Sequence, residues 1–306
     1  MYQLENFYGK RAFDQWISRK PDDLSACRES VPPTEVWPVQ SYDELIDAIA
    51  FLTVMNKRST LMFRGQRSQA EPLPRLFRDR GRFMETDHCF DLTPQNRAKY
   101  WSYLPEIGSA VYEICRRPKF GLPRWRGLER IREVQWAVIQ HYELWPTPMI
   151  DLTSSLRVGS TFALGWNGQS ATRPTKGYLY VVGMPSPSGS IVFDIDEHIT
   201  LARLHSCCPP IARRPHLQDG FLVGRFPFKD TEDRDSRKKS SLRFRTIAIF
   251  ELTHNGDFWG RVHTPLPKDA LLPDDDGLAT AFASEFGSGG RLDLISLATR
   301  LAHDVA

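Results

Sequence analysis

Apolar residues recur at helical spacing through much of the first half of the chain. A capping box, Ser41 followed by Glu44, opens the segment "SYDELIDAIAFLTVM", whose apolar residues share one helix face: Leu45, Ile49, Leu52 and Met55. Residues 105–117 and 127–142 are also predicted to be helical. The second of these has one apolar stripe, made of Leu128, Ile131, Val134, Val138 and Tyr142.

The pattern changes to strands in the second half. Four β-branched and aromatic runs are bounded by Gly, Pro or Asp: "GYLYVVGM", "SIVFDI", "GFLVGRF" and "TIAIFELT". Shorter strands are predicted in "TLMFRGQ" and "MIDLT", and an amphipathic helix is predicted in "LDLISLATRLAHDVA" near the C-terminus. Because helices gather early and strands late, the sequence predicts the α+β class rather than regular βαβ alternation.

One arginine stands out in this pattern. Arg64 follows Phe63 on the strand "TLMFRGQ" and precedes Gly65, where the backbone is freed for close approach of a ligand. A guanidinium beside apolar neighbours has two interpretations. Either it binds an anionic ligand, or it forms an internal ion pair with a carboxylate such as Asp151.

Composition is that of an ordinary globular protein. The chain has 306 residues, 41% hydrophobic and 25% charged, with a formal net charge of +3. This charge is too small to indicate a nucleic-acid or membrane partner, and no apolar run is long enough to cross a bilayer. The first residues are polar and lack a signal-peptide core, so we expect a cytoplasmic protein.

The five cysteines are odd in number and lack the usual metal-ligand spacing. They are Cys27, Cys89, Cys115, Cys207 and Cys208. With His205 and His216, the adjacent Cys207 and Cys208 could be drawn as a metal site, but a loop with reduced thiols is favoured. No metal site is therefore predicted.

Three motifs, in order, resemble the bacterial FRG domain, named after its Phe-Arg-Gly triplet. They are Phe63-Arg64-Gly65-Gln66, "QHYELWPTPMIDLTSSLRVGSTFA" from Gln140 to Ala163, and "RRPHLQDGFLV" from Arg213 to Val223. The segment "LLPDDDGLA" resembles the end of that domain. The sequence departs from the family pattern at Glu143, Pro148, Leu152 and Asp219.

The resemblance divides the chain into three parts. Residues 1–40 would be a lead-in that packs on the core, residues 41–285 the FRG domain, and residues 286–306 a C-terminal amphipathic helix. The FRG domain in turn is similar to the ADP-ribosyltransferase fold. This implies a split or distorted mixed β-sheet flanked by helices, with N- and C-terminal helical extensions.

The second resemblance assigns roles around NAD. Arg64 matches the arginine of the first strand in that fold, Thr153-Ser154-Ser155 match its hydroxyl triplet, and Gln218 stands where a catalytic glutamate is expected. Residues implied to bind NAD are Arg64, Gly65, Gln66, Arg78, Thr153 and Ser155. Residues implied to be catalytic are Ser154, His141 and Gln218.

Each of these roles has a structural alternative. Serine and threonine after a strand also cap helices, His141 lies on a helical stripe and can be a packed histidine, and Arg78 can be a solvated arginine. Gln218 carries no charge, and if it lies on a strand, Asp219 points to the opposite face. Either the reaction then tolerates the amide, or the carboxylate comes from elsewhere, or the protein binds without catalysing.

The resemblance implies an NAD-consuming mono-ADP-ribosyltransferase, such as a bacterial toxin or phage-defence effector. Its partners would be NAD, a macromolecular acceptor and, for a toxin, a neutralising protein. The alternatives are an NAD hydrolase and a non-catalytic nucleotide-sensing module that uses the same cleft. The sequence has no glycine-rich phosphate loop and no Gly-x-Ser-x-Gly elbow.

Overall fold

The predicted α+β class is confirmed in a computed structural model. The structure describes residues 7–18, 24–33, 35–78, 80–82, 89–91, 93–117, 126–166, 175–226, 236–254 and 256–286. The chain divides into two compact units, each assembled from three separate segments. The first unit is made of 1–72, 152–187 and 241–271, and the second of 73–151, 188–240 and 272–306.

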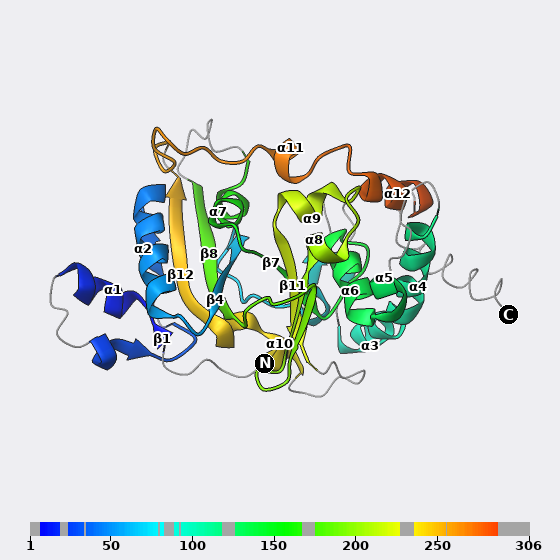
Figure 1. The fold of residues 1–306 in the computed structure, drawn as a ribbon, viewed down its shortest axis with the longest axis horizontal. Coiled ribbons are helices and arrows are strands. Elements are labelled where there is room, and N and C mark those ends of the chain that lie inside the picture. The colour runs from blue at the N-terminus through cyan, green and yellow to red at the C-terminus, as the bar shows by residue number, and fades with distance from the viewer. Residues whose placement is uncertain are drawn as a thin grey trace. The chain divides into compact units, whose positions relative to one another are not determined.

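A mixed sheet of eight strands, flanked by helices, has the strand order β3-β12-β8-β4-β7-β11-β10-β9 (Figure 1). In the first unit lie β3 (Trp37–Val39), β4 (Thr60–Gln66), β8 (Thr175–Met184) and β12 (Thr246–His254). In the second lie β9 (Ile191–Asp194), β10 (Ile199–Arg203) and β11 (Gly220–Arg225), and β7 (Met149–Thr153) has residues in both. Two small antiparallel sheets pair β1 (Phe7–Tyr8) with β2 (Arg28–Glu29), and β5 (Arg80–Arg82) with β6 (Cys89–Asp91).

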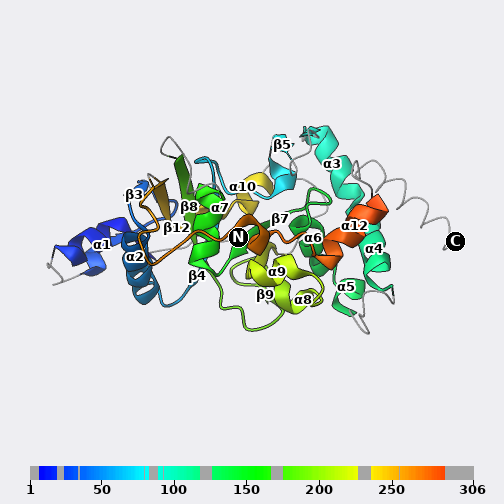
Figure 2. The ribbon, with the colours of Figure 1, turned by 90° about the horizontal axis from the view of Figure 1, so that it is seen from above.

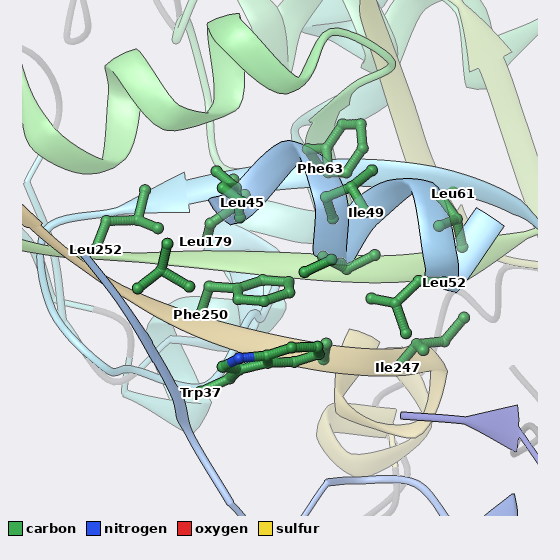
Figure 3. Packing of buried hydrophobic residues seen from close by; sticks show 14 of the residues in the cluster. Trp37, Leu45, Ile49, Leu52, Leu61, Phe63, Leu179, Ile247, Phe250 and Leu252 are labelled. Carbon is green, nitrogen blue, oxygen red and sulfur yellow. The ribbon is translucent and has the colours of Figure 1, made fainter. Parts of the chain in front are cut away.

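The first unit has an apolar core between its helices and one face of its strands. Its helices are α1 (Lys10–Ile17), α2 (Tyr42–Met55), α7 (Leu156–Leu164) and α11 (Lys268–Leu271), with 3₁₀ turns at Leu24–Cys27 and Leu242–Arg245. Figure 3 shows the α2 side chains packed among strand residues of this core, including Phe63, Leu179 and Phe250.

The predicted helix after Ser41 is confirmed. Ser41 Oγ accepts a hydrogen bond from the Glu44 N–H at 3.2 Å, and Glu44 Oε2 accepts one from the Gln40 N–H at 2.9 Å. In a standard capping box the glutamate accepts from the N–H of the N-cap residue, whereas here Glu44 accepts from Gln40, the residue before the N-cap. Of the predicted stripe, Leu45, Ile49 and Leu52 are buried and Met55 is half-buried.

Helix α7 rests directly on strands β4 and β8, and glycines make this possible. A Cβ at Gly65 would collide with the Gly159 carbonyl oxygen and the Ala163 nitrogen, and one at Gly177 with the Ala163 carbonyl. A Cβ at Gly159 would lie 2.9 Å from Phe63 Cβ. The structure therefore explains Gly65 by helix packing, on the sheet face that carries Phe63.

The second unit is mostly helical around β9–β11. Its helices are α3 (Pro94–Ser102), α4 (Leu104–Cys115), α5 (Arg126–Arg130), α6 (Arg132–His141), α8 (Leu204–Cys207), α9 (Arg213–Leu217), α10 (Ser236–Ser240) and α12 (Gly277–Phe286), with a 3₁₀ turn at Arg75–Phe77. Helix α12 lies beside α4 in both views (Figures 1 and 2). The helix predicted at 105–117 is confirmed as α4.

The single helix predicted at 127–142 is wrong, because the chain breaks at Ile131 into α5 and α6. Ile131 has extended backbone angles (φ −115°, ψ 104°) and is the N-cap of α6. The break leaves the Leu128 carbonyl without its helical N–H, and the Gln135 side chain donates to it instead at 2.8 Å. Leu128, Val134 and Tyr142 are nevertheless buried as the stripe predicts.

The four predicted strands of the second half are confirmed as β8, β9, β11 and β12. Strand β10 and helix α12 were not predicted. The predicted helix at 286–306 lies outside the described residues apart from Phe286, the last residue of α12. In the N-terminal part, Phe7, Phe13 and Trp37 belong to the core of the first unit.

One buried carboxylate joins three elements of the second unit. Asp276 is fully buried, and both its oxygens accept from the Tyr142 hydroxyl at 3.1 Å. Its Oδ2 also accepts from the Arg214 N–H at 2.7 Å and its Oδ1 from the Ala279 N–H at 2.7 Å. Asp276 therefore caps α12 and holds the end of α6 and the start of α9.

Replacing Asp276 tests this role. Asp276→Ala removes the acceptor for the buried Tyr142 hydroxyl and for two partly buried N–H groups, so we expect the free energy of unfolding to fall by about 2–4 kcal/mol. Asp275→Ala is the neighbouring control, since Asp275 forms an exposed ion pair with Arg213 and should change stability by less than about 1 kcal/mol. Urea unfolding followed by circular dichroism measures both, and equal effects would contradict the assignment.

A second prediction concerns the contact between α7 and β4. Gly65→Ala forces a methyl group into the backbone of α7, so we expect a loss of about 3 kcal/mol or more. Gly127→Ala is the matched control, because a Cβ there meets nothing within 4 Å and replaces a helical glycine, which should stabilise by up to about 1 kcal/mol. Thermal melting of both variants decides, and a tolerated Gly65→Ala would show that α7 packs differently.

Candidate functional site

The predicted site residues are divided between the two units. Arg64, Gly65, Gln66 and the triplet Thr153–Ser155 belong to the first unit. Arg78, His141 and Gln218 belong to the second.

Arg64 lies on the sheet face opposite the apolar core. Phe63 and Gly65 face α7, and side chains alternate along a strand, so Arg64 and Gln66 point to the other face. On the neighbouring strand β8, Arg64 pairs with Tyr180 and Gln66 pairs with Tyr178.

The same face continues onto β12, where Glu251 pairs with Tyr178. Residues directly opposite one another on paired strands share a face of the sheet. We call this set the polar sheet face: Arg64, Gln66, Tyr178, Tyr180 and Glu251.

Hydrogen bonds fix one end of the polar sheet face. Arg64 Nε donates to Gln66 Oε1 at 2.9 Å, and Gln66 Nε2 donates to the Ala70 carbonyl at 2.9 Å. The Tyr180 hydroxyl donates to the same carbonyl at 2.8 Å. Burial raises the pKa of Tyr180 to about 12, although the Arg64 charge opposes the shift, so this phenol is neutral and donates. Gln66 thus orients the guanidinium and secures the segment after β4.

Glu251 supplies a carboxylate at the other end. It accepts from Lys176 Nζ at 2.6 Å and from the Tyr178 hydroxyl at 3.0 Å. The hydrogen bond from Lys176, followed by that from Tyr178, lowers the pKa of Glu251, so the group is ionised at neutral pH. The sequence analysis did not select Glu251. The alternation of "IFELT" was the available signal, because it predicts that Glu251 points to the other face of the sheet from Phe250 and Leu252.

The hydroxyl triplet has a visible structural role. Thr153 pairs with Phe63, so its side chain is on the face opposite Arg64; its Oγ1 accepts from the Ser155 N–H at 3.0 Å. Ser155 is the N-cap of α7, and its Oγ accepts from the Val158 N–H at 3.3 Å. Capping is therefore shown for Ser155. Ser154 is half-buried and follows the last residue of β7.

His141 belongs to a buried polar network in the second unit. Its Nδ1 lies 3.3 Å from Asp151 Oδ1, and Gln140 Nε2 donates to Asp151 Oδ2 at 3.1 Å. The Thr147 hydroxyl in turn donates to Gln140 Oε1 at 3.1 Å. His141 has a side chain only 4% exposed, and its Nε2 has no hydrogen-bond partner among the described residues. The network orients His141 through Asp151, which remains partly exposed.

Gln218 and Asp219 lie in a turn, which corrects the assumption of a strand. Gln218 is the C-cap of α9, with φ −87° and ψ −5°, and Asp219 has a positive φ of 44°. Strand β11 begins only at Gly220. Strand alternation therefore does not apply to these two side chains. Asp219 Oδ1 lies 3.6 Å from His205 Nδ1.

Arg78 ends the turn of residues 75–77. Its Nε donates to the Leu73 carbonyl at 2.9 Å, and the side chain is half-buried rather than fully solvated. This hydrogen bond between the Arg78 side chain and the Leu73 carbonyl stabilises the turn. A role in phosphate binding stays a prediction.

The paired cysteines are buried rather than arranged as ligands. Burial raises the pKa of Cys207 to about 11 and that of the neighbouring Cys115 to about 12, so both thiols are neutral. Within the described ranges, no three His, Cys, Asp or Glu side chains gather as a metal site. No described helix has the length and apolar character needed to span a membrane.

Comparisons with known protein families, with curated proteins and with solved structures found no match.

Proposed function

We propose that the protein is an NAD-consuming mono-ADP-ribosyltransferase that holds the NAD pyrophosphate with Arg64. The observation that carries the proposal is the place of Arg64. It lies on the polar sheet face, with its guanidinium oriented by Gln66 and a neutral tyrosine, Tyr180, on the adjacent strand. The FRG resemblance and an ADP-ribosyltransferase-like core are part of this proposal.

The chemistry of the polar sheet face suits a dinucleotide. A guanidinium donates parallel, charge-assisted hydrogen bonds to phosphate oxygens, which a Lys ammonium does not reproduce. Tyr178 is half-buried, and its ring offers an apolar surface for a nicotinamide or adenine ring. Arg64 would bind the phosphates and Tyr178 the neighbouring ring.

The transfer breaks the bond between nicotinamide and C1′ of its ribose, and the electron pair leaves with nicotinamide. A nucleophile of the acceptor then forms a bond to C1′ and loses its proton to a base. The intervening state resembles an oxocarbenium ion, which a carboxylate stabilises. Glu251 is an ionised carboxylate on the same sheet face as Arg64, and we assign it this role.

The resemblance adds Ser154 to the proposal, as a residue of the first unit that would contact the ribose. Gln218 and His141 belong to the second unit, and their catalytic roles stay predictions. Gly65 and Thr153 lie on the sheet face that packs against α7, and Ser155 caps that helix, so the proposal does not place them around NAD. Arg78 belongs to the second unit, and its role stays a prediction. The acceptor would be a macromolecule, and a neutralising partner would accompany a toxin or phage-defence effector.

A nucleotide-sensing module is the second candidate. It is favoured by the amide of Gln218 and by the ion pair that already engages Glu251 with Lys176. Such a module would bind NAD through Arg64 without releasing nicotinamide. An NAD hydrolase would use the same residues, with water in place of the macromolecular acceptor.

Labelled NAD distinguishes these functions when it is incubated with the purified protein and lysate. Label on a macromolecule supports the transferase, label on free ADP-ribose supports the hydrolase, and saturable binding with neither product supports the sensing module.

Variants of the polar sheet face test the proposal itself. Arg64→Ala should lower NAD turnover or binding by about 10²-fold, and Arg64→Lys should restore only part, because the charge returns without the two-pronged geometry. Glu251→Gln should lower turnover by about 10²-fold with little change in NAD affinity. Arg58→Ala, an exposed arginine of the same unit, is the matched control and should change nothing.

Thermal melting is measured on each variant alongside the NAD assays. If Arg64 only stabilises the fold, Arg64→Ala should have a lower melting temperature than the wild type. Any loss of NAD turnover in Arg64→Lys should then be accompanied by a loss of stability. The proposal fails if Arg64→Ala remains folded and keeps wild-type NAD binding and turnover.

A further inference from the structure

The first unit contains a pocket that none of the site residues predicted from the sequence lines. Its volume is about 270 Å³, and it lies between α1, β2 and the start of β12. Its apolar surface comes from Trp37, Ile247 and Ile249. Its charged residues are Lys10, Arg11, Asp14, Glu29 and Glu35.

The strand pairing explains why the pocket exists. Strand β3 begins at Trp37, which pairs with Phe250, so β12 residues 247–249 extend beyond the end of β3. Among the described residues, no strand pairs with that side of β12. The helix α1 and the β2 strand supply charged side chains around this uncovered segment.

Two of the five charged groups neutralise each other. Lys10 Nζ lies 2.7 Å from Asp14 Oδ2, one helical turn away. This leaves one cation, Arg11, and two carboxylates, Glu29 and Glu35, facing the pocket. The Arg11 guanidinium has no hydrogen-bond partner in the part of the chain that the structure describes.

Glu29 is the group whose surroundings call for a cation. Its Oε1 accepts from the Arg11 N–H at 3.1 Å. Burial raises the pKa of Glu29 although the N–H bond and the charge of Arg11 oppose the shift, so Arg11 offsets the burial only in part and a bound cation would offset more of it. Glu35 is mostly exposed at the rim, 4.0 Å from Lys10.

The charges and size select the class of ligand. Two basic and three acidic side chains give the lining a net charge of −1, which opposes a phosphate-bearing ligand. Lys10 and Arg11 oppose a polyamine. The volume is just below the lower end of drug-sized pockets, about 300 Å³. A small zwitterion with an apolar part has no phosphate and only one ammonium group, and it is small enough for this volume.

We propose that this pocket binds an α-amino acid with an apolar side chain. The ammonium group contacts Glu29 and Glu35, the carboxylate contacts the Arg11 guanidinium, and the side chain lies against Trp37, Ile247 and Ile249. Ile249 pairs with Tyr180 and so shares its face of the sheet, but the charged groups of the pocket come from α1, β2 and Glu35 and are not those of the NAD proposal.

Calorimetric titration of the full chain with L-leucine, L-methionine and L-phenylalanine tests the site, with N-acetyl-L-leucine and L-leucinamide as probes that lack one charge. We expect saturable binding of at least one amino acid, and affinity lower by about tenfold or more for each blocked form of leucine. The proposal is overturned if no amino acid binds saturably, or if both blocked forms bind as well as leucine.

Two variants test which side chain contacts the carboxylate of the amino acid and which contacts its ammonium group. Arg11→Gln, at an exposed side chain, should bind leucine and leucinamide equally, whereas Glu29→Gln should reduce the preference for leucine over N-acetyl-leucine without abolishing it, because Glu35 remains. Glu129→Gln, an exposed carboxylate of the second unit, is the control and should bind like the wild type. Unchanged discrimination in Arg11→Gln overturns the proposal, whatever Glu29→Gln does.

Stability separates a binding role of Glu29 from a structural one. A glutamine oxygen still accepts from the Arg11 N–H, and it lacks the charge that burial disfavours. Glu29→Gln should therefore melt at the same temperature as wild type or higher, while its affinity falls. A lower melting temperature with unchanged affinity shows a structural carboxylate and contradicts the site.

Discussion

The direct contact between helix α7 and strands β4 and β8 determines what each face of the first unit can do. Gly65 and Gly177 let the strands approach the backbone of α7 directly, and Gly159 lets the helix approach the side chains of Phe63 and Leu179. One face is thereby committed to the apolar core that contains Phe63 and Leu179. The alternate residues of the same strands must point to the other face, which is why Arg64 and Gln66 meet Tyr178, Tyr180 and Glu251 there. Gly65 was expected to allow close approach of a ligand, but it allows close approach of α7. Arg64, the residue before it, therefore points to the opposite face of the sheet.

The second unit has an apolar core and, in addition, polar networks. Its elements come from three stretches of the chain, and Asp276 joins α6, α9 and α12 through one buried carboxylate. The chain Thr147, Gln140, Asp151 and His141 forms a second buried network, and it fixes a histidine that has one ring nitrogen without a partner among the described residues. Such networks restrict side-chain orientation because each buried donor needs its acceptor. They explain why polar residues of the "QHYELWPTPMID" segment are buried without being part of an apolar stripe.

Elements with strong local signals could be predicted from the sequence. The Ser41 capping box and the stripe of α2 act within one helix, and the long runs of β8 and β12 alternate clearly. Tertiary contacts decided the rest. The break at Ile131 depends on the Gln135 side chain replacing a backbone donor, and the turn at Gln218 depends on a positive φ at Asp219, which only the folded chain reveals. Arg64 could be selected because a charge on an apolar strand is unusual. For Glu251 the local alternation indicates only which face it points to. Its partners Tyr178 and Lys176 lie on a strand about 70 residues earlier, and the local sequence does not specify the cross-strand register.

The central claim is that the polar sheet face is where the protein binds a dinucleotide. Hydrogen–deuterium exchange of the full chain, with and without NAD, tests this without assuming any product. A ligand that contacts side chains of both strands should suppress local opening of β4 and β8, and should therefore slow backbone amide exchange in peptides that cover them. The account predicts protection of residues 60–70 and 175–184 that saturates with NAD and is lost in Arg64→Ala. Saturating protection elsewhere in the chain, with those two segments unchanged, would contradict it.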